Sequence, residues 1–370
     1  MSIIFAILIF SFLIFIHEFG HFIAAKASGV QVNEFSIFMG PVIYKKQRGE
    51  TLYSIRCIPI GGFCAMEGED SDTDNPRSFQ KAAWWKRLII LLAGSFMNMV
   101  AGVLIMLIVF LPTTAMVTPT ISGFADYCTI SGENGLQVGD RILEIDGEKV
   151  YVQADFSTIL TLNGGEVHDL VVERNGQKVT LNDLKMEKHK VLVEIKDENG
   201  NPVLDENGNV KTVEQMMYGL NFTLVENPSL GQRLQHGLLM SVDSVRNVRL
   251  SLQMLVTGKA SVQDIGGPVM IVDQMNQVAA ASSSFVDALL NMLYFGAFIA
   301  INLAVMNLLP IPALDGGRVL CLLLTTVIEA ITRKKLNPKY EGYIHAGGMI
   351  LLLALMALIM FKDVFTIILR

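Results

Sequence analysis

The chain has 370 residues, of which 51% are hydrophobic and 17% are charged, and its formal net charge is −6 at pH 7. Soluble domains carry about 25% charged residues, so the composition excludes an ordinary soluble protein and indicates that much of the chain lies in a membrane. The net charge itself says little about function, and we expect the bilayer and membrane proteins, not nucleic acid, as partners.

Four long apolar segments predict about four transmembrane helices, near residues 2–25, 88–112, 285–309 and 343–361. Each is about twenty residues long, which suffices for one crossing of a ~30 Å hydrocarbon core. The first segment carries no Lys or Arg at its start and no small-residue cleavage site before the polar residues that follow it. We therefore interpret it as a retained helix and not as a signal peptide.

The placement of positive charge predicts the orientation of these helices. Lys and Arg concentrate in cytoplasmic loops. The loop between the first two segments contains Lys26, Lys45, Lys46, Arg48, Arg56, Arg77, Lys81, Lys86 and Arg87, and the loop between the last two contains Arg333, Lys334, Lys335 and Lys339. Both short loops are thus expected inside, and both termini and the region between the second and third segments outside.

Short strands and turns are predicted between the helices. Residues 41–63 alternate loosely around a Gly-containing turn, which predicts a β-hairpin. Residues 118–225 contain Asp-Gly and Asn-Gly turns at 146–147 and 175–176 and no long apolar run, which indicates a separate domain of short strands. Residues 228–258 carry apolar side chains at helical spacing and predict an amphipathic helix against the outer membrane face or the other helices.

A duplicated D-x-N-x-N spacing at 197–209 is reminiscent of a calcium loop. A calcium loop of this type needs Gly at its sixth position, where the two copies have Pro202 and Val210. We therefore expect paired turns there. The chain as a whole is predicted to consist of four parts, 1–117, 118–227, 228–283 and 284–370.

The sequence HEFGH, from His17 to His21, ends the first apolar segment. On a helix the two histidines lie one turn apart on one face and can both reach one zinc ion at ~2.0–2.1 Å. Zinc lowers the pKa of a bound water toward ~7, and Glu18 is placed to take its proton. H-E-x-x-H on a helix is the signature of zinc metalloproteases. The alternative, a pair of surface histidines, is weakened because ionisable groups in lipid cost roughly 2.5–3.5 kcal/mol or more.

A third ligand is predicted in NLAVMNLLPIPALDGGRVL, residues 302–320. Pro310 and Pro312 cannot continue a helix, and a broken helix at membrane depth is tolerated where it lines a cavity or is buried in protein. Asp315 follows this break at the same predicted inner edge as His17, and would complete a three-ligand catalytic site. The alternative role for Asp315 is a helix N-cap. The remaining histidines fit less well, because His168, His189 and His236 fall in the outer region and His345 is expected at the interface.

Together these motifs resemble the site-2 protease family of intramembrane zinc metalloproteases, and most closely the bacterial regulator-of-sigma-E type with one PDZ-like domain. The resemblance includes PIGGF (59–63), AGSFMNMVAG (93–102, with Ser95 where relatives usually have Pro) and GGPVMI (266–271). It implies that Zn2+ is held by His17, His21 and Asp315, with Glu18 as general base. It also implies that the unwound substrate is handled by Asn307, Pro310, Pro312 and the Gly61 and Gly62 of a membrane-reentrant β-loop.

The implied fold is a polytopic α-helical membrane protein with a membrane-associated β-hairpin and a PDZ-like α+β domain inserted between helices two and three. The implied activity is regulated intramembrane proteolysis in the bacterial inner membrane. Its substrates would be single-pass proteins already cut by a first protease, such as anti-sigma factors and remnant signal peptides. Two other function classes are weighed. A PDZ scaffold with structural zinc would need four protein ligands, and a transporter would need polar residues across several spans. The sequence leaves open the physiological substrate, the oligomeric state, whether the PDZ-like domain gates or recruits, and whether residues 362–370 belong to the last helix.

Overall fold

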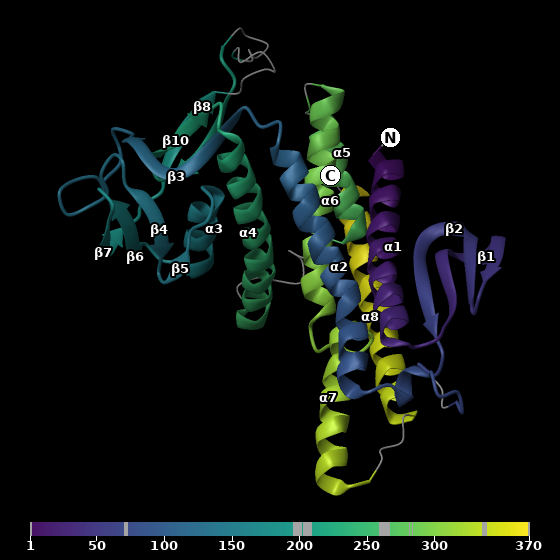
Figure 1. The fold of residues 1–370 in the computed structure, drawn as a ribbon. Coiled ribbons are helices and arrows are strands. Elements are labelled where there is room, and N and C mark those ends of the chain that lie inside the picture. The colour runs from purple at the N-terminus through teal and green to yellow at the C-terminus, as the bar shows by residue number, and fades with distance from the viewer. Residues whose placement is uncertain are drawn as a thin grey trace. The chain divides into compact units, whose positions relative to one another are not determined.

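The computed structural model describes residues 2–69, 73–194, 202, 209–258, 267–280, 282, 284–334 and 339–368. It divides into two compact units, one formed by Met1–Val109 with Ser244–Arg370 and the other by Phe110–Asp243. The first unit holds the long apolar helices and the second holds most of the strands (Figure 1). The duplicated segment at 197–209 falls, apart from Pro202 and Asn209, outside the described residues.

Four helices are the longest apolar elements of the first unit: α1 (Ser2–Ser28), α2 (Trp84–Phe110), α6 (Phe285–Asn307) and α8 (Lys339–Ile368). The described residues contain four stretches long and apolar enough to cross a membrane, Ile4–Ser28, Trp84–Phe110, Phe285–Asn307 and Glu341–Phe365. They coincide with the four predicted segments, with ends shifted by a few residues. Because α8 runs to Ile368, residues 362–368 belong to the last helix.

Further helices lie between these elements: η1 (Phe79–Lys81), α4 (Leu230–Thr257), α5 (Pro268–Ala280) and α7 (Asp315–Thr332). The amphipathic helix expected at 228–258 is α4. Neither α5 nor α7 was expected, because each is too short or too mixed in polarity to stand out in a search for uniformly apolar spans. The missed α7 matters most, since it begins at Asp315.

The hairpin expected at 41–63 is longer than predicted. Its strands are β1 (Val32–Arg48) and β2 (Thr51–Met66), joined at the expected Gly-containing turn. Each strand also bends back on itself, at Gly40 and Gly61, whose φ angles of 86° and 83° favour glycine. The segment 34–37 therefore lies between two others, with Phe35 opposite both Tyr53 and Cys64. Paired segments follow in the order 42–48, 51–56, 34–37 and 62–66, so 62–66 forms one edge of this sheet.

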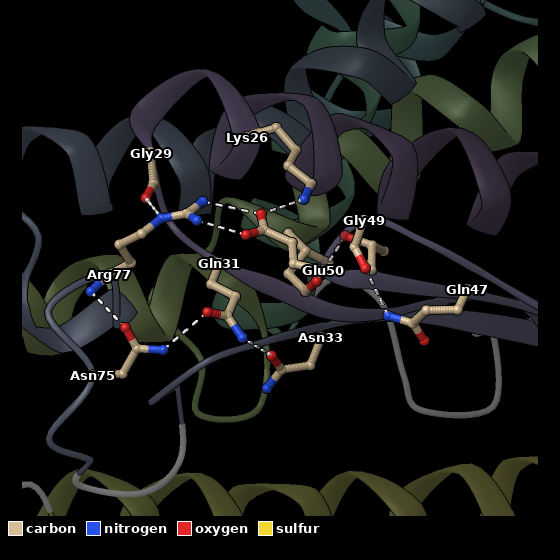
Figure 2. Close-up of polar contacts among 11 residues, drawn as sticks. Lys26, Gly29, Gln31, Asn33, Gln47, Gly49, Glu50, Asn75 and Arg77 are labelled. Carbon is tan, nitrogen blue, oxygen red and sulfur yellow. Dashed lines mark hydrogen bonds and ion pairs between the residues drawn. The ribbon is translucent and has the colours of Figure 1, made fainter.

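Two hydrogen bonds fix the β1–β2 sheet alongside α1. The Ser11 hydroxyl donates to the Pro59 carbonyl at 2.7 Å. Near the other end of α1, Lys26 Nζ donates to Glu50 Oε1 at 2.6 Å, and Arg77 donates to both carboxylate oxygens of Glu50 at 2.5 and 2.9 Å. Figure 2 shows this cluster, here called the Glu50 junction (Lys26, Glu50 and Arg77). Ser11 and Lys26 are about 22 Å apart along the helix, at ~1.5 Å per residue, so the sheet follows α1 over most of its length.

The second unit is an α+β domain. Its main sheet has the order β10-β3-β4-β6-β7 with β5 paired to β4, and β8 pairs separately with β9. The elements are β3 (Ala115–Phe124), β4 (Arg141–Ile145), β5 (Glu148–Lys149), α3 (Ala154–Asn163), β6 (Val167–Arg174), β7 (Gln177–Lys185), β8 (His189–Glu194), β9 (Thr212–Met217) and β10 (Leu220–Glu226). The predicted turns at 146–147 and 175–176 are confirmed, because they join β4 to β5 and β6 to β7.

This domain has its own core. Ile142 and Ile145 of β4 and Leu170 of β6 are completely buried, and Phe156 of α3 packs against them. The Phe156 ring also lies 5.5 Å from that of Phe222 on β10, centroid to centroid. Helix α3 thus covers one face of the sheet and shields its apolar side chains from water.

Candidate metal centre

The first half of the site comes from one face of α1. His17 and His21 are one turn apart, and their Nε2 atoms are 3.2 Å from each other. The side chain of His21 is 9% exposed and that of His17 is 13% exposed. The apolar helix predicted from the sequence therefore holds two imidazole nitrogens close enough to share one ion.

The second half comes from the start of α7. Asp315 Oδ2 lies 3.1 Å from His17 Nε2 and 3.4 Å from His21 Nε2. The N-cap of α7 is Leu314, and no side chain caps the helix there. The alternative interpretation of Asp315 as an N-cap is therefore wrong. Its carboxylate faces the histidines.

Two glycines after Asp315 let the preceding loop fold back on α7. A Cβ atom on Gly316 would lie 2.3 Å from the Leu309 carbonyl oxygen, and one on Gly317 would lie 2.3 Å from that of Ile311. Any larger residue would push backbone against backbone. The Asp-Gly-Gly sequence thus combines a candidate ligand with the close backbone approach that positions it.

The geometry of the three side chains fits a tetrahedral ion. With metal–ligand bonds of ~2.0–2.1 Å, the edges of such a tetrahedron measure about 3.3–3.4 Å. The three nitrogen and oxygen atoms are 3.1, 3.2 and 3.4 Å apart. Within the described part of the chain no hydrogen bond reaches the buried Asp315 Oδ2. His17, His21 and Asp315 are also the only group of three or more potential ligand residues among the described residues whose ligand atoms converge.

Helix α2 closes the site from the other side. The Ile90 carbonyl lies 2.8 Å from His21 Nδ1. A Cβ atom on Gly94 would lie 2.4 Å from His21 Nε2 and 2.8 Å from His17 Nε2, so glycine leaves the space in which an ion would sit. Asn98 Nδ2 lies 3.4 Å from His17 Nδ1. The sequence analysis did not assign roles to Gly94 and Asn98, although a polar Asn in an apolar span, four residues after a Gly, was an available signal.

Glu18 lies between the histidines and the edge of the β1–β2 sheet. A Cβ atom on Gly62 would lie 3.8 Å from Glu18 Cγ and 2.9 Å from the Ser36 carbonyl oxygen. The structure therefore brings Gly62 next to Glu18. Gly61 forms the adjoining bend.

The other predicted substrate residues surround the break before α7. Asn307 is the last residue of α6, and Pro310 and Pro312 lie in the loop that follows. His345 of α8, expected only at the interface, accepts a hydrogen bond at Nδ1 from the Ala313 backbone at 3.1 Å. In the second unit, the buried His168 instead pairs with Asp146 at 2.7 Å.

Comparison with known proteins places this chain in a family. The model of peptidase family M50 matches residues 5–355. A Clostridium perfringens protein named "Putative zinc metalloprotease" is 36% identical over 379 residues, covering 98% of both chains. A Clostridium acetobutylicum protein of the same description is 36% identical over 373 residues, covering 98% of this chain and 97% of the relative. The "Regulator of sigma-W protease RasP" of Bacillus subtilis is 26% identical over 441 residues, covering 97% of both. The chain therefore belongs to peptidase family M50 and is a zinc metalloprotease of the site-2 protease type.

Proposed function

We propose that this zinc metalloprotease cleaves single-pass membrane proteins within the bilayer, with zinc held by His17, His21 and Asp315 and with Glu18 as general base. The observation that carries the proposal is the convergence of these three side chains, whose nitrogen and oxygen atoms are 3.1–3.4 Å apart. The two histidines lie on a helix long and apolar enough to cross a membrane, and Asp315 reaches them from the start of α7.

Zinc in a site with three protein ligands supplies a Lewis acid and lowers the pKa of water to about 7. The chain's own contribution is the carboxylate of Glu18, which takes the proton of the attacking water and delivers it to the leaving amine. A Cβ atom on Gly62 of the sheet edge would lie 3.8 Å from Glu18 Cγ, so this edge borders the carboxylate. The sheet edge would therefore be part of the catalytic arrangement.

The depth of the site follows from helix length. Sixteen residues precede His17, which is about 24 Å at 1.5 Å per residue. Lys26 lies in the last turn of α1, and Lys86 lies in the first turn of α2. With these basic residues inside, both termini lie outside and cleavage occurs toward the cytoplasmic side of the bilayer.

The β1–β2 sheet fits a membrane-reentrant element. Its edge segment begins with apolar residues, of which Ile43 is 69% and Tyr44 56% exposed, and continues with the exposed Lys45 and Lys46. An apolar stretch followed by Tyr and Lys is typical of a segment that leaves the hydrocarbon at the interface. The hydrogen bond from Ser11 of α1 to the Pro59 carbonyl of β2 supports placing this end of the sheet within the membrane as well.

The opposite edge, residues 62–66, suits the capture of an extended substrate. A transmembrane helix hides its peptide groups, and pairing with a free strand edge can hold a segment extended for attack. Gly62 on this edge lies beside Glu18. Asn307, Pro310 and Pro312 would contact the same unwound segment from the loop before α7.

The substrate class is proposed from the relative's name and the second unit. One relative is named a regulator of sigma-W protease, so we propose anti-sigma factors and remnant signal peptides, trimmed by a first protease, as substrates. The α+β unit would be a PDZ-like domain outside the inner membrane, with β10 as an edge strand of its sheet. It would admit or recruit trimmed substrates.

The proposal is tested by pairing zinc content with cleavage. The wild type and Glu18→Gln are purified in detergent, zinc is quantified, and each is given a tagged single-pass transmembrane peptide. We expect about one zinc per chain in both, and cleavage reduced 10²–10⁴-fold in Glu18→Gln, the usual contribution of a general base. Zinc in both proteins with equal cleavage would remove Glu18 from its role. Zinc with no cleavage by the wild type would favour a structural metal.

A further inference from the structure

We infer that Asn98 is a positioning residue that accepts a hydrogen bond from His17 Nδ1 and thereby directs His17 Nε2 toward zinc. The inference rests on the proposed ligand set. It concerns a residue of α2 that lies outside the H-E-x-x-H sequence and outside the loop before Asp315.

His21, the other histidine of the site, already has a partner of this kind. His21 Nδ1 lies 2.8 Å from the Ile90 carbonyl oxygen, which can only accept. The Nδ1 of His21 must therefore carry the proton, and its Nε2 is left with a lone pair that points at Asp315. Metal-binding histidines are commonly fixed in this way by a second partner on the far ring nitrogen.

His17 needs an equivalent acceptor. Its Nε2 is the atom that faces Asp315 and His21, so the tautomer that binds a metal through Nε2 carries its proton on Nδ1. The carboxamide of Asn98 lies next to Nδ1, with its nitrogen 3.4 Å away. The two ends of a carboxamide are nearly isosteric, and the hydrogen-bond network decides which end faces the ring.

The burial of Asn98 points to the oxygen end. Asn98 is 1% exposed, and over the described residues its Oδ1 has no hydrogen-bond partner. A buried acceptor without a partner is rare in folded proteins. A half-turn of the amide about its Cβ–Cγ bond brings Oδ1 to the Nδ1–H of His17 and gives this oxygen a donor.

The register of α2 explains why one helix serves both histidines. Ile90, Gly94 and Asn98 are spaced four residues apart and so share one face of the helix. Ile90 faces His21, Gly94 leaves room at both Nε2 atoms, and Asn98 faces His17. This single face thus supplies an acceptor for each ligand ring and the space between them.

The experiment compares Asn98→Leu, which removes the acceptor, with Asn98→Asp, which can accept but cannot donate. Ser95→Ala is the matched control, since Ser95 is equally buried one turn earlier on α2. The full-length proteins are purified in detergent, zinc affinity is measured by competition with a chelator, and the absorption spectrum of the Co²⁺-substituted protein reports ligand geometry. Cleavage of the transmembrane peptide is measured in parallel.

We expect Asn98→Leu to bind zinc about 10–100-fold more weakly and to change the Co²⁺ spectrum, as loss of a second partner does in other metal sites. Asn98→Asp should restore both, and Ser95→Ala should match the wild type. Wild-type affinity in Asn98→Leu would overturn the inference, and so would equal loss in Asn98→Asp, because that result would assign Asn98 the role of donor.

Two features keep the test decisive. If Asn98→Leu does not fold, as judged by its thermal transition, Asn98→Asp alone separates acceptor from donor. If the wild type itself binds no zinc at this site, the proposed function has failed. If the wild type binds zinc and only the Asn98 variants bind it weakly, the result concerns the role of Asn98 and leaves the proposed function intact.

Discussion

Two carboxylates of this protein are each held between two nitrogen-bearing side chains, and their surroundings are opposite. Glu50 receives three hydrogen bonds from Lys26 and Arg77 at the Glu50 junction, where Arg77 is 48% exposed (Figure 2). Asp315 lies between His17 and His21, and among the described residues no hydrogen bond reaches its Oδ2. The exposed cluster is already satisfied by its own partners. The buried one leaves Asp315 Oδ2 without a hydrogen bond among the described residues, and a cation could bind there.

The difference shows how to tell a structural ion pair from a ligand set. The Arg77 and Lys26 bonds keep the pKa of Glu50 low, at about 2, because they favour the charged carboxylate. Such pairs near solvent stabilise a fold by at most about 1 kcal/mol. A set of buried polar atoms without hydrogen-bond partners contributes little to the stability of the fold by itself. It points instead to a site that binds an ion.

The largest expected effect comes from the same chemical change at both carboxylates. Asp315→Asn should weaken zinc binding by more than the roughly 100-fold seen when a residue behind a metal ligand is changed, because it replaces the charged carboxylate proposed to bind the ion. Glu50→Gln should leave zinc affinity unchanged. Zinc titration of both variants checks this, and the comparison fails if Glu50→Gln loses zinc as strongly as Asp315→Asn.

The second effect comes from a comparison of two glycines of α2. One lies beside the histidines of the candidate metal centre, and the other packs against Ile301. Gly94→Ala would place a Cβ atom 2.4 Å from His21 Nε2, so we expect loss of zinc and of cleavage. In Gly102→Ala the Cβ atom would lie 2.6 Å from Cγ1 of the buried Ile301, which should cost about 1–3 kcal/mol and leave zinc in place. Metal analysis and thermal unfolding of both variants test the prediction. Full zinc occupancy in Gly94→Ala would contradict it.

The smallest effect is the pH dependence of the Glu50 junction. The folded pKa of Glu50, about 2, is lower than the unfolded value of about 4.3. Its stabilisation is therefore fully present above that unfolded value and is lost as the pH falls toward the folded one. In thermal unfolding at pH 6, the Tm of the wild type should be slightly higher than that of Glu50→Gln. This gap in Tm should narrow on acidification. The gap should also narrow in about 1 M NaCl, which screens exposed charges. A gap that stays constant as the pH falls would refute the assignment.

The sequence by itself determined those features that depend on residues near one another along the chain. Helical spacing places His17 and His21 on one face, and apolar length marks the four candidate spans. The turns at 146–147 and 175–176 follow from Asn or Asp before Gly, because these residues tolerate the required backbone angles. Asp315 could be named as the third ligand because prolines and glycines mark its surroundings.

Only the tertiary structure decided what depends on distant segments. The folding of β1 and β2 back on themselves, the contact of Gly62 with Glu18, and the approach of Gly94 and Asn98 to the histidines all join residues that are far apart in the chain. A polar residue such as Asn98 is visible in the sequence, but its partner is not. Which buried atom Asn98 faces depends on how α1 and α2 pack together. Local sequence propensity does not encode the distance between two helices.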